Sequence, residues 1–525
     1  MAAVEAKPAL VFIGFMGAGK TVAARAVAGA LDEPFVDADE AFAESHGELP
    51  AELIEREGEA AFRAAERELV AELLAGERRV IGLGGGAVET PEVRAALSGQ
   101  VVVWCEVGHE EARRRVEADP AASRPLAADP EAFRERYERR QPIYAELATA
   151  VLPEGGPELA ARAAPFLAAL RELPGARMAW ARSASGDYPA YVGRGLLEAG
   201  PLGRAAQHGE IGLSERSFCV TDATVGPVYA DAIEPLAARI EVEPGEQAKT
   251  LAEAERVMRE LADAGMTRSD HLVALGGGVV GDLAGFCAAT YQRGVDVVQL
   301  PTTLVAQVDS AYGGKTGVDL PEAKNYVGAY HQPAAVIADP ATLATLPPAE
   351  LAAGFVEVVK TALLAGGPLW ERVRLLDSLE PERFDEVIFD CARTKLAVVA
   401  ADERDSGHRQ VLNLGHTVGH AIESATRYAR YRHGEAVGLG LLAALRLSGA
   451  DGLREEVAGL LERNGLPVEL DPDTELDSVL AAVERDKKRT ESGVGFVLLE
   501  RPGAPLIGQR IEADRVRQAV QELVR

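Results

Sequence analysis

One short stretch near the start of the chain has the residue types and spacing of an anion-binding loop. Residues 14–21 read GFMGAGKT, which fits G-x4-G-K-[ST] between an apolar run at 9–15 and a helix-forming stretch. In that setting backbone N–H groups surround phosphate oxygens, Lys20 bridges the β- and γ-phosphates, and Thr21 ligates Mg²⁺. The stretch therefore predicts a nucleoside triphosphate site, formed by Gly17, Ala18, Gly19, Lys20 and Thr21.

Acidic and basic residues that suit a phosphate acceptor follow this loop. The stretch VDADE places Asp37 and Asp39 at the end of the next predicted strand, on one face. One carboxylate suits the water shell of Mg²⁺ and the other suits a base for an acceptor hydroxyl; a solvated pair of loop acids is the plain alternative. Arg63 in AAFRAAE, Arg140 in RRQPIY and the bare amides of LGGGAV at 83–88 suit a small carboxylate.

Lysine is rare in this chain, so its positions are informative. Only nine of the 55 basic residues are Lys. Lysine supplies a compact point charge that arginine does not replace, so the remaining lysines are candidate site residues. The stretch 301–328 holds Lys315 and Lys324 beside glycine turns, together with Asp309 and Asn325. It predicts a phosphorylated or carboxylated ligand.

A second LGGG sequence, at 275–278, leads into the stretch 276–286, GGGVVGDLAGF, after a predicted strand. Alone it is weak evidence for a dinucleotide. Asp222 strengthens the case, because it ends the predicted strand FCVTD where an acid that binds a ribose is expected. The flanks of the two LGGG sequences share no longer period, so we do not interpret them as an internal repeat.

Histidines and an acid later in the chain suit a metal. His416 and His420 in LNLGHTVGHAIE lie at i and i+4 on one helical face, and this spacing predicts that both ligate metal. His433 follows in YRHGEAVG, and Glu357 precedes Lys360 by three residues on another predicted helix. Three or four of these groups suit a zinc site with an open position.

The order of predicted elements indicates an α/β protein with two series. We expect residues 1–172 to form a phosphate-loop domain with a parallel sheet flanked by helices, and 173–179 to form a short linker. We expect 180–339 to form a Rossmann-like α/β part, and 340–525 to form a mainly helical part with a late strand in GVGFVLLE.

The first part resembles shikimate kinase. The phosphate loop, D-x-D, F-R, GGGA, R-P-L and R-x-P-x-Y occur in order between residue 9 and about 170. The resemblance implies that Asp39, Arg63, Gly85 and Arg140 bind shikimate, with Lys20 and Asp39 catalytic. It implies that Arg124, in a Pro-rich stretch suited to a lid, contacts ATP, and that Thr21 and Asp37 serve Mg²⁺.

Residues from about 180 to 525 resemble 3-dehydroquinate synthase. The resemblance assigns Glu357, His416 and His433 to Zn²⁺ or Co²⁺, and His420 to the substrate and proton transfer, in place of the metal role that spacing alone predicts. It implies substrate contacts and catalytic groups at Arg293, Lys315, Asn325, Lys360, Lys395, Arg409, Asn413 and one or both of Lys487 and Lys488. It implies NAD⁺ contacts at Asp222, Glu246, Lys249, Gly278, Asp282, Thr302, Thr303, Asp309, Lys324 and Thr345. The chain departs from the family at Pro244, Ala248, Tyr312 and Asp405, and none of these removes a ligand or a cationic contact.

The two resemblances imply a bifunctional enzyme of aromatic amino acid (chorismate) biosynthesis. One part would phosphorylate shikimate with ATP and Mg²⁺. The other would convert 3-deoxy-D-arabino-heptulosonate 7-phosphate to 3-dehydroquinate plus phosphate, through transient oxidation by NAD⁺. Two alternatives remain: a phosphate-loop domain that only senses ATP, and a zinc-dependent polyol dehydrogenase joined to another small-molecule kinase.

Composition bears on the partners and the cellular location of the protein. The net charge of −27 argues against nucleic acid as a partner. The sequence has no run of 18 apolar residues and no basic leader with a cleavage site, so we expect a cytoplasmic protein without a membrane partner. The four scattered cysteines are expected to be buried thiols. The synthase resemblance implies a homodimer through the C-terminal part.

Overall fold

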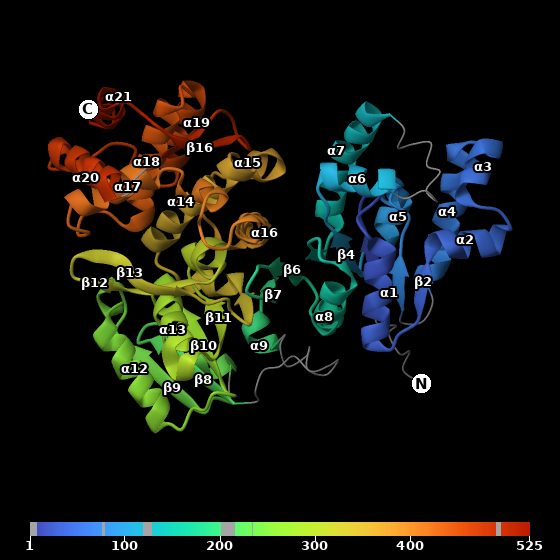
Figure 1. The fold of residues 1–525 in the computed structure, drawn as a ribbon, viewed down its shortest axis with the longest axis horizontal. Helices are drawn as coiled ribbons and strands as arrows, with labels where there is room; N and C mark the ends of the chain where they lie inside the picture. The colour runs from blue at the N-terminus through green and yellow to red at the C-terminus, as the bar shows by residue number, and fades with distance from the viewer. Residues whose placement is uncertain are drawn as a thin grey trace. The chain divides into compact units, whose positions relative to one another are not determined.

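The computed structural model describes residues 8–75, 79–118, 129–200, 216–233, 235–489 and 495–524, and in 485–489 it describes the backbone alone (Figure 1). The chain divides into two compact units. The first contains the described residues through Trp180 together with 199–200, and the second contains Ala181–Glu198 and the described residues from 216 onward.

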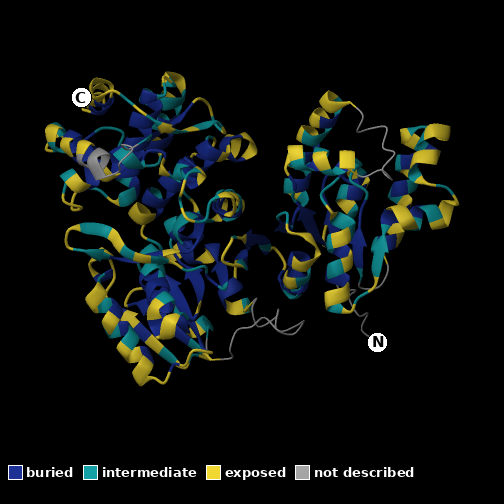
Figure 2. Cartoon of the chain, in the orientation of Figure 1, coloured by how far each residue is buried: buried dark blue, intermediate teal, exposed yellow. Residues whose placement is uncertain are grey.

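The first unit is built on a parallel sheet with the strand order β2-β3-β1-β4-β5-β6. Its strands are β1 Leu10–Ile13, β2 Phe35–Asp37, β3 Val80–Gly82, β4 Val101–Cys105, β5 Ala150–Leu152 and β6 Arg177–Arg182. Every residue of β1 and β4 is buried, as expected for a parallel sheet covered on both faces (Figure 2). The predicted α/β class is confirmed for this unit.

Helices follow the strands of the first unit in chain order. They are α1 Lys20–Leu31, α2 Ala38–His46, α3 Pro50–Glu57, α4 Glu59–Leu74, α5 Pro91–Ala96, α6 His109–Ala118, α7 Pro130–Leu147 and α8 Gly156–Ala169. Because the strands are parallel, their carboxyl ends lie at one edge of the sheet. The loop after β1, the acids after β2 and the LGGG loop after β3 therefore meet at that edge.

The second unit begins with its own set of parallel strands, in the order β7-β14-β11-β10-β8-β9. Its strands are β7 Asp187–Val192, β8 Ser217–Asp222, β9 Ala238–Val242, β10 His271–Gly276, β11 Asp296–Pro301 and β14 Ala335–Ala338. The helices of this part are α9 Leu196–Ala199, α11 Gly226–Tyr229, α12 Leu251–Asp263 and α13 Gly278–Thr290. Apolar residues of α12 and α13 pack with Phe218, Val220 and Leu272 of the sheet in one buried cluster.

An antiparallel hairpin lies within the stretch that the sequence predicted as glycine turns. Its strands are β12 Lys315–Leu320 and β13 Ala323–Tyr330. Gly317 and Gly328 face each other across it, and a methyl group on Gly317 would lie 2.8 Å from the carbonyl oxygen of Val327. The glycines thus permit close strand contact, which composition alone did not distinguish from loop.

The rest of the second unit is mainly helical, as predicted. The helices are α14 Pro348–Ala365, α15 Gly367–Val373, α16 Asp385–Ala401, α17 His416–Ala425, α18 His433–Leu447, α19 Asp451–Arg463, α20 Leu476–Arg489 and α21 Ala513–Gln521. A late hairpin of β15 Phe496–Leu499 and β16 Pro505–Gln509 contains the predicted strand.

Two further expectations concern the whole chain. All four cysteines are buried and unpaired, so the prediction of buried thiols is confirmed. Among the described helices, none is both long enough and apolar enough to cross a membrane. The domain boundaries at 172, 179 and 339 remain a prediction.

Candidate active sites

The phosphate loop of the first unit is shaped by glycines that tolerate no side chain. Gly14 and Gly17 have φ of 147° and 81°. A methyl group on Gly14 would lie 2.5 Å from the carbonyl oxygen of Cys105, and one on Gly17 would lie 2.7 Å from that of Ala112. The loop can therefore pack against the ends of β4 and α6 only with glycine at both positions.

The predicted phosphate and Mg²⁺ residues lie together at the start of α1. The Lys20 ammonium donates to the Phe15 carbonyl at 3.2 Å, and the Thr21 hydroxyl donates to Asp37 Oδ2 at 2.9 Å. The other oxygen of Asp37 accepts the backbone N–H of Asp39 at 2.9 Å and so caps α2. The hydroxyl and carboxylate that the resemblance assigns to Mg²⁺ are thus in direct contact.

The first LGGG loop lies against the predicted acceptor residues. A methyl group on Gly84 would lie 3.2 Å from Asp39 Oδ1, and one on Gly85 would lie 3.7 Å from Lys20 Nζ. A methyl group on Gly86 would clash with Arg63 and would lie 3.0 Å from Arg140 Nη2. The structure therefore brings an acid, a lysine and two arginines around backbone amides, as an acidic acceptor requires.

Two glutamates, the buried Glu66 and the half-buried Glu89, hold the arginines, and sequence reasoning missed both. Arg63 pairs with Glu66 at 2.7 Å, and burial raises the pKa of Glu66 despite Arg63. Arg140 donates Nε and Nη2 to one oxygen of Glu89, at 2.9 and 2.5 Å. Burial opposes charge on Glu89, but Arg140 outweighs it and lowers the pKa of that carboxyl. The i, i+3 spacing of Arg63 and Glu66 could have indicated the first pair, whereas no local signal indicates the second.

One predicted nucleotide contact, Arg124, lies outside the described residues. Tyr144, the last residue of R-x-P-x-Y, donates its hydroxyl to the Gly85 carbonyl at 2.6 Å. The R-x-P-x-Y motif thus supplies Arg140 and also anchors the LGGG loop through Tyr144.

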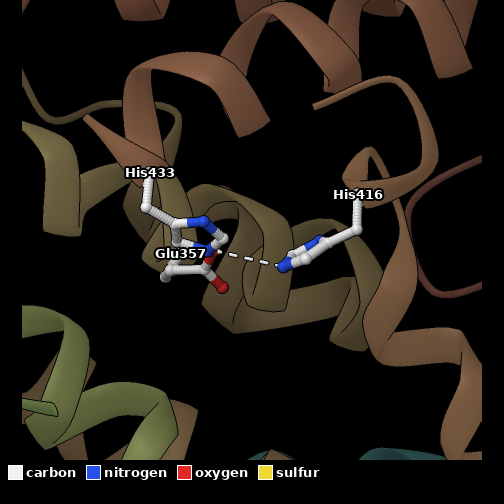
Figure 3. A group of neighbouring side chains, drawn as sticks. All are labelled: Glu357, His416 and His433. Atoms are coloured by element: carbon white, nitrogen blue, oxygen red, sulfur yellow. Dashed lines mark ion pairs between the residues drawn. The ribbon is translucent and has the colours of Figure 1, made fainter. Parts of the chain in front are cut away.

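In the second unit, three helices bring together one acid and two histidines (Figure 3). Glu357 of α14, His416 at the start of α17 and His433 at the start of α18 place donor atoms within 4.8 Å of one another. Glu357 Oε1 lies 3.7 Å from His416 Nε2 and 3.5 Å from His433 Nε2. This buried oxygen accepts no hydrogen bond within the described part of the chain. Two imidazoles and an unsatisfied carboxylate fit a zinc-type ion.

Close contacts at glycines set these helices in place. A methyl group on Gly434, next to His433, would clash with the carbonyl of Ala353, one turn before Glu357. A methyl group on Gly440 would clash with the carbonyl of Gly415, next to His416. α18 therefore touches α14 and α17 directly, and this contact brings the three donors together.

The surroundings shift the pKa values of the two histidines in opposite directions. The Nδ1 atom of His416 is 3.2 Å from the Leu414 carbonyl, which directs Nε2 toward Glu357. Burial and then Lys360 lower the pKa of His416 to about 3, so the ring stays neutral. Burial opposes charge on His433, but Glu357 and Glu423 outweigh it and raise its pKa to about 10.

His420 is not a member of this group. Its donor atom instead lies within 4.8 Å of those of Glu423 and His433. The spacing argument treated His416 and His420 alike, but of these two it is His416 whose Nε2 lies beside Glu357. This placement agrees with the separate role that the resemblance gave to His420.

A chain of buried charges adjoins the cluster. Lys360 Nζ lies 2.5 Å from Glu357 Oε2 and donates to Asp309 Oδ2 at 3.0 Å. Lys395 contacts the other oxygen of Asp309 and its carbonyl. Burial disfavours the charge on both lysines, yet Asp309 and Glu357 raise the pKa of Lys360, whereas that of Lys395 is lowered. Asp309, expected on the NAD⁺ side, therefore links two predicted substrate lysines.

A second lysine group lies near the start of α13. Lys249 is buried, pairs with Asp282 at 2.6 Å and contacts the Asn325 side chain. Lys324 lies 3.7 Å from Glu246 and 4.4 Å from the centre of the Tyr428 ring. Asn325, expected to bind substrate, thus contacts a lysine expected to bind NAD⁺.

The carboxyl edge of the second sheet carries the second LGGG loop. A methyl group on Gly277 would lie 3.0 Å from Thr303 Cγ2, and one on Gly278 would lie 2.9 Å from Ser310 Oγ. The hydroxyl of Thr302 is buried and has no hydrogen-bond partner among the described residues. Asp222 accepts the backbone N–H groups of residues 224 and 225, each at 2.8 Å. A bare loop and an unsatisfied hydroxyl at this edge fit a dinucleotide.

The remaining predicted residues each have contacts of their own. Lys315 pairs with Asp405 at 2.5 Å, and buried Arg409 donates to the carbonyls of Glu403 and Gly313. The hydroxyl of Thr345 is 2.7 Å from that of Tyr229. Asn413 is exposed.

Arg293 is exposed and follows the C-terminal end of α13, with φ of 71°. It lies beyond the end of the helix that starts with Gly278 and contains Asp282, and about 12 Å of helix separates Asp282 from that end. The structure does not place it with the buried lysines. Lys487 and Lys488 lie in α20, but their side chains are outside the described part.

The second unit matches known proteins over most of its length. Residues 239–353 match the family model "3-dehydroquinate synthase N-terminal", and residues 354–489 match "3-dehydroquinate synthase C-terminal". The 3-dehydroquinate synthase of Halorhodospira halophila is 41% identical over 363 residues, which cover 66% of this chain and 100% of that protein. The chain belongs to the 3-dehydroquinate synthase family.

Solved structures share the fold of the synthase part. A 2-epi-5-epi-valiolone synthase from Streptomyces hygroscopicus subsp. jinggangensis 5008, with NAD⁺ and Zn²⁺ bound, is 26% identical. It matches with a TM-score of 0.56 over 64% of this chain and 96% of its own. A 2-deoxy-scyllo-inosose synthase complexed with carbaglucose-6-phosphate, NAD⁺ and Co²⁺ shares the fold, at 24% identity and a TM-score of 0.58, over 66% of this chain and 99% of its own.

The first unit has its own match. Residues 16–171 match the family model "Shikimate kinase". A shikimate kinase domain is therefore fused ahead of the 3-dehydroquinate synthase part, as the motifs predicted. The interpretation of the two LGGG loops as unrelated agrees with their placement in two different domains.

Proposed function

We propose that this chain is a bifunctional enzyme of aromatic amino acid biosynthesis. The kinase domain would transfer the γ-phosphate of ATP to shikimate and form shikimate 3-phosphate. The synthase part would convert 3-deoxy-D-arabino-heptulosonate 7-phosphate to 3-dehydroquinate and phosphate. The proximity of the Glu357, His416 and His433 group to a chain of buried lysines is the single observation that carries the proposal.

In the kinase domain, the residues around the LGGG loop would orient and activate the acceptor. Lys20 would neutralise phosphate oxygens, while Thr21 and Asp37, already in contact, would hold Mg²⁺. Arg63 and Arg140 would bind the carboxylate of shikimate. Asp39, beside the loop, would then accept the proton of the hydroxyl that attacks ATP.

In the synthase part, the residues would divide between a cofactor edge and a charged pocket. The bare loop at Gly277 and Gly278, with Thr302, would face NAD⁺, and Glu357, His416 and His433 would hold Zn²⁺ or Co²⁺. When bound, NAD⁺ would take up and return a hydride and the metal would polarise a hydroxyl oxygen of the substrate. Two relatives with NAD⁺ and a divalent metal bound support this division.

The charged residues near the metal group would handle the anionic substrate. Lys360, Lys395 and Arg409 are buried, and they would bind its carboxylate and phosphate once it replaces part of their present pairing. His420, outside the metal group, would move a proton during elimination of phosphate. We also propose the roles that the two family resemblances imply for the other site residues.

One ³¹P NMR experiment tests both activities. The purified chain is incubated with the heptulosonate phosphate, NAD⁺, Zn²⁺, shikimate, ATP and Mg²⁺. Inorganic phosphate, ADP and a new phosphomonoester together would support both. Release of phosphate from the heptulosonate without phosphorylation of shikimate would overturn the kinase activity and favour an ATP-sensing domain.

The acceptor residues favour a kinase over a sensor. A domain that only senses ATP needs no acid and paired arginines around a second glycine loop. Net formation of NADH from a simple polyol would favour the dehydrogenase alternative.

Two further parts of the proposal concern the molecule in the cell. We propose a homodimer formed through the synthase part and a cytoplasmic location. Light scattering of the full chain and of the chain with a charged substitution on the synthase surface tests the first, and cell fractionation tests the second.

A further inference from the structure

One buried carboxylate near the metal group has no role in the mechanism above. Glu423 lies on α17, seven residues after His416 and three after His420, so all three lie along one side of the helix. Glu423 is 4% exposed. A carboxylate this deeply buried needs a partner, because an uncompensated buried charge is costly.

The partner of Glu423 is a metal ligand. Its Oε2 lies 3.4 Å from Nδ1 of His433, whereas Nε2 of the same ring lies 3.5 Å from Glu357 Oε1. The imidazole is thus held between two carboxylates, one at each nitrogen. With a proton on Nδ1 directed to Glu423, the lone pair of Nε2 is left for a metal.

The turn between α17 and α18 is shaped to make this contact. α17 ends at Ala425, and His433 opens α18. Between them Arg427 and Tyr428 have φ of 54° and 56°, a left-handed conformation that is unfavourable for residues other than glycine. Tyr428 N–H donates back to the Glu423 carbonyl at 2.8 Å. The strained turn folds the chain back so that His433 faces Glu423.

The same carboxylate also lies near the proposed proton-transfer histidine. The donor atoms of His420, Glu423 and His433 lie within 4.8 Å of one another. Glu423 therefore adjoins a metal ligand and the group that would move the proton.

We propose that Glu423 is the positioning residue of the metal site, which holds His433 in the tautomer and orientation that metal binding needs. This inference rests on the proposed metal site. Loss of such an outer carboxylate weakens metal binding about 10- to 100-fold in comparable sites. Glu423 would act through His433, because His433 belongs to the metal group whereas Glu423 does not.

The test measures metal binding by the full chain without any turnover. Zn²⁺ affinity is obtained by competition with a chromophoric chelator for the wild type, Glu423→Ala and Glu423→Gln. We expect affinity about 10- to 100-fold weaker for Glu423→Ala. A smaller loss is expected for Glu423→Gln, because the amide keeps an acceptor oxygen but loses the charge. The visible spectrum of bound Co²⁺ should also shift in both variants, since a ligand ring has moved.

A matched control separates this effect from general damage to α18. Glu435→Gln makes the same change two residues after His433, where the carboxylate pairs with Arg432 and caps the helix. We expect wild-type Zn²⁺ affinity for this variant. Equal affinity in both Glu423 variants and the wild type, or an equal loss in Glu435→Gln, would overturn the inference while the metal site stands. Absence of Zn²⁺ binding by the wild type would overturn the metal site and the inference together.

Discussion

At the scale of single residues, the first LGGG loop needs glycine because neighbouring side chains occupy the space that a methyl group would fill. Gly86 has φ of −98°, a value open to any residue, so backbone freedom does not explain it. The space beside it is filled by the guanidinium groups of Arg63 and Arg140. Glycine there lets the two cations approach the backbone that would receive the substrate.

We expect Gly86→Ala to weaken shikimate binding selectively. The added methyl must displace Arg63, and such overpacking costs about 1–3 kcal/mol. KM for shikimate should rise about tenfold or more, with a small change in KM for ATP, in steady-state assays of the kinase. Gly29→Ala, in α1 with open space at the added methyl, is the control. An unchanged KM for shikimate in Gly86→Ala would contradict the placement of the acceptor.

Asp309 pairs with two buried lysines and so compensates their positive charges. Its carboxylate faces both Lys360 and Lys395, and the two ammonium groups would otherwise repel each other in a buried space. Its neighbours also lower the pKa of Asp309 although burial opposes its charge. Pocket stability and substrate binding therefore depend on the same carboxylate.

We expect Asp309→Asn to destabilise the synthase part by about 3–5 kcal/mol, because it leaves buried lysine charge uncompensated. Differential scanning calorimetry should show a lower Tm for the synthase transition, and synthase activity should fall. Kinase activity at a temperature below that transition should stay the same. A Tm equal to that of the wild type would show that Lys360 and Lys395 do not need Asp309.

At the scale of elements, glycines along α18 fix the geometry of the metal group. Gly434 touches α14 and Gly440 touches α17 through backbone atoms. Gly438, on the same helix, has room, since its nearest contact for an added methyl is 3.4 Å. Helix spacing at two glycines, rather than the side chains alone, therefore brings Glu357, His416 and His433 together.

We expect Gly434→Ala to reduce Zn²⁺ affinity at least about tenfold, because the methyl would force α18 away from α14 at a cost of about 1–3 kcal/mol. Gly438→Ala is the matched control. It should keep wild-type affinity and gain up to about 1 kcal/mol of stability from helix propensity. Chelator competition and thermal unfolding measure the two effects. Equal Zn²⁺ affinity in both variants would show that the α14–α18 contact does not set the site.

At the scale of the whole molecule, each unit has its own set of parallel strands and its own group of site residues. The kinase residues come from the ends of β1, β2 and β3 together with α4 and α7, and the metal group comes from α14, α17 and α18. The two candidate sites share no residue. The chemistry of one should therefore survive loss of the other.

We expect a crossed pattern of inactivation. Lys20→Ala should lower kinase kcat/KM on the order of 100-fold or more through loss of transition-state charge stabilisation, with synthase activity unchanged. His416→Ala should abolish Zn²⁺-dependent synthase activity, with kinase activity unchanged. Both reactions are measured by ³¹P NMR on each variant. Loss of both activities in either folded variant would contradict independent sites.

Much of this organisation was predictable from sequence because its signals are local. The phosphate loop is one continuous motif whose strand–loop–helix setting follows from neighbouring residues, and the α/β class follows from alternating elements. The helical character after residue 340 was also local. The β12–β13 hairpin was missed, because glycine composition does not distinguish a close strand contact from a loop.

The chemical groups could be identified from the amino-acid sequence: a phosphate loop, acids and arginines for an acceptor, rare lysines, and histidines at helical spacing. Which of these groups meet became clear from the three-dimensional fold. It separated His416 from His420, joined Asp309 to Lys360 and Lys395, and placed Glu89 on Arg140 and Glu423 on His433. These pairings join residues on different elements, in most cases far apart in the chain. Their geometry depends on helix contacts and strand order, which no local pattern encodes.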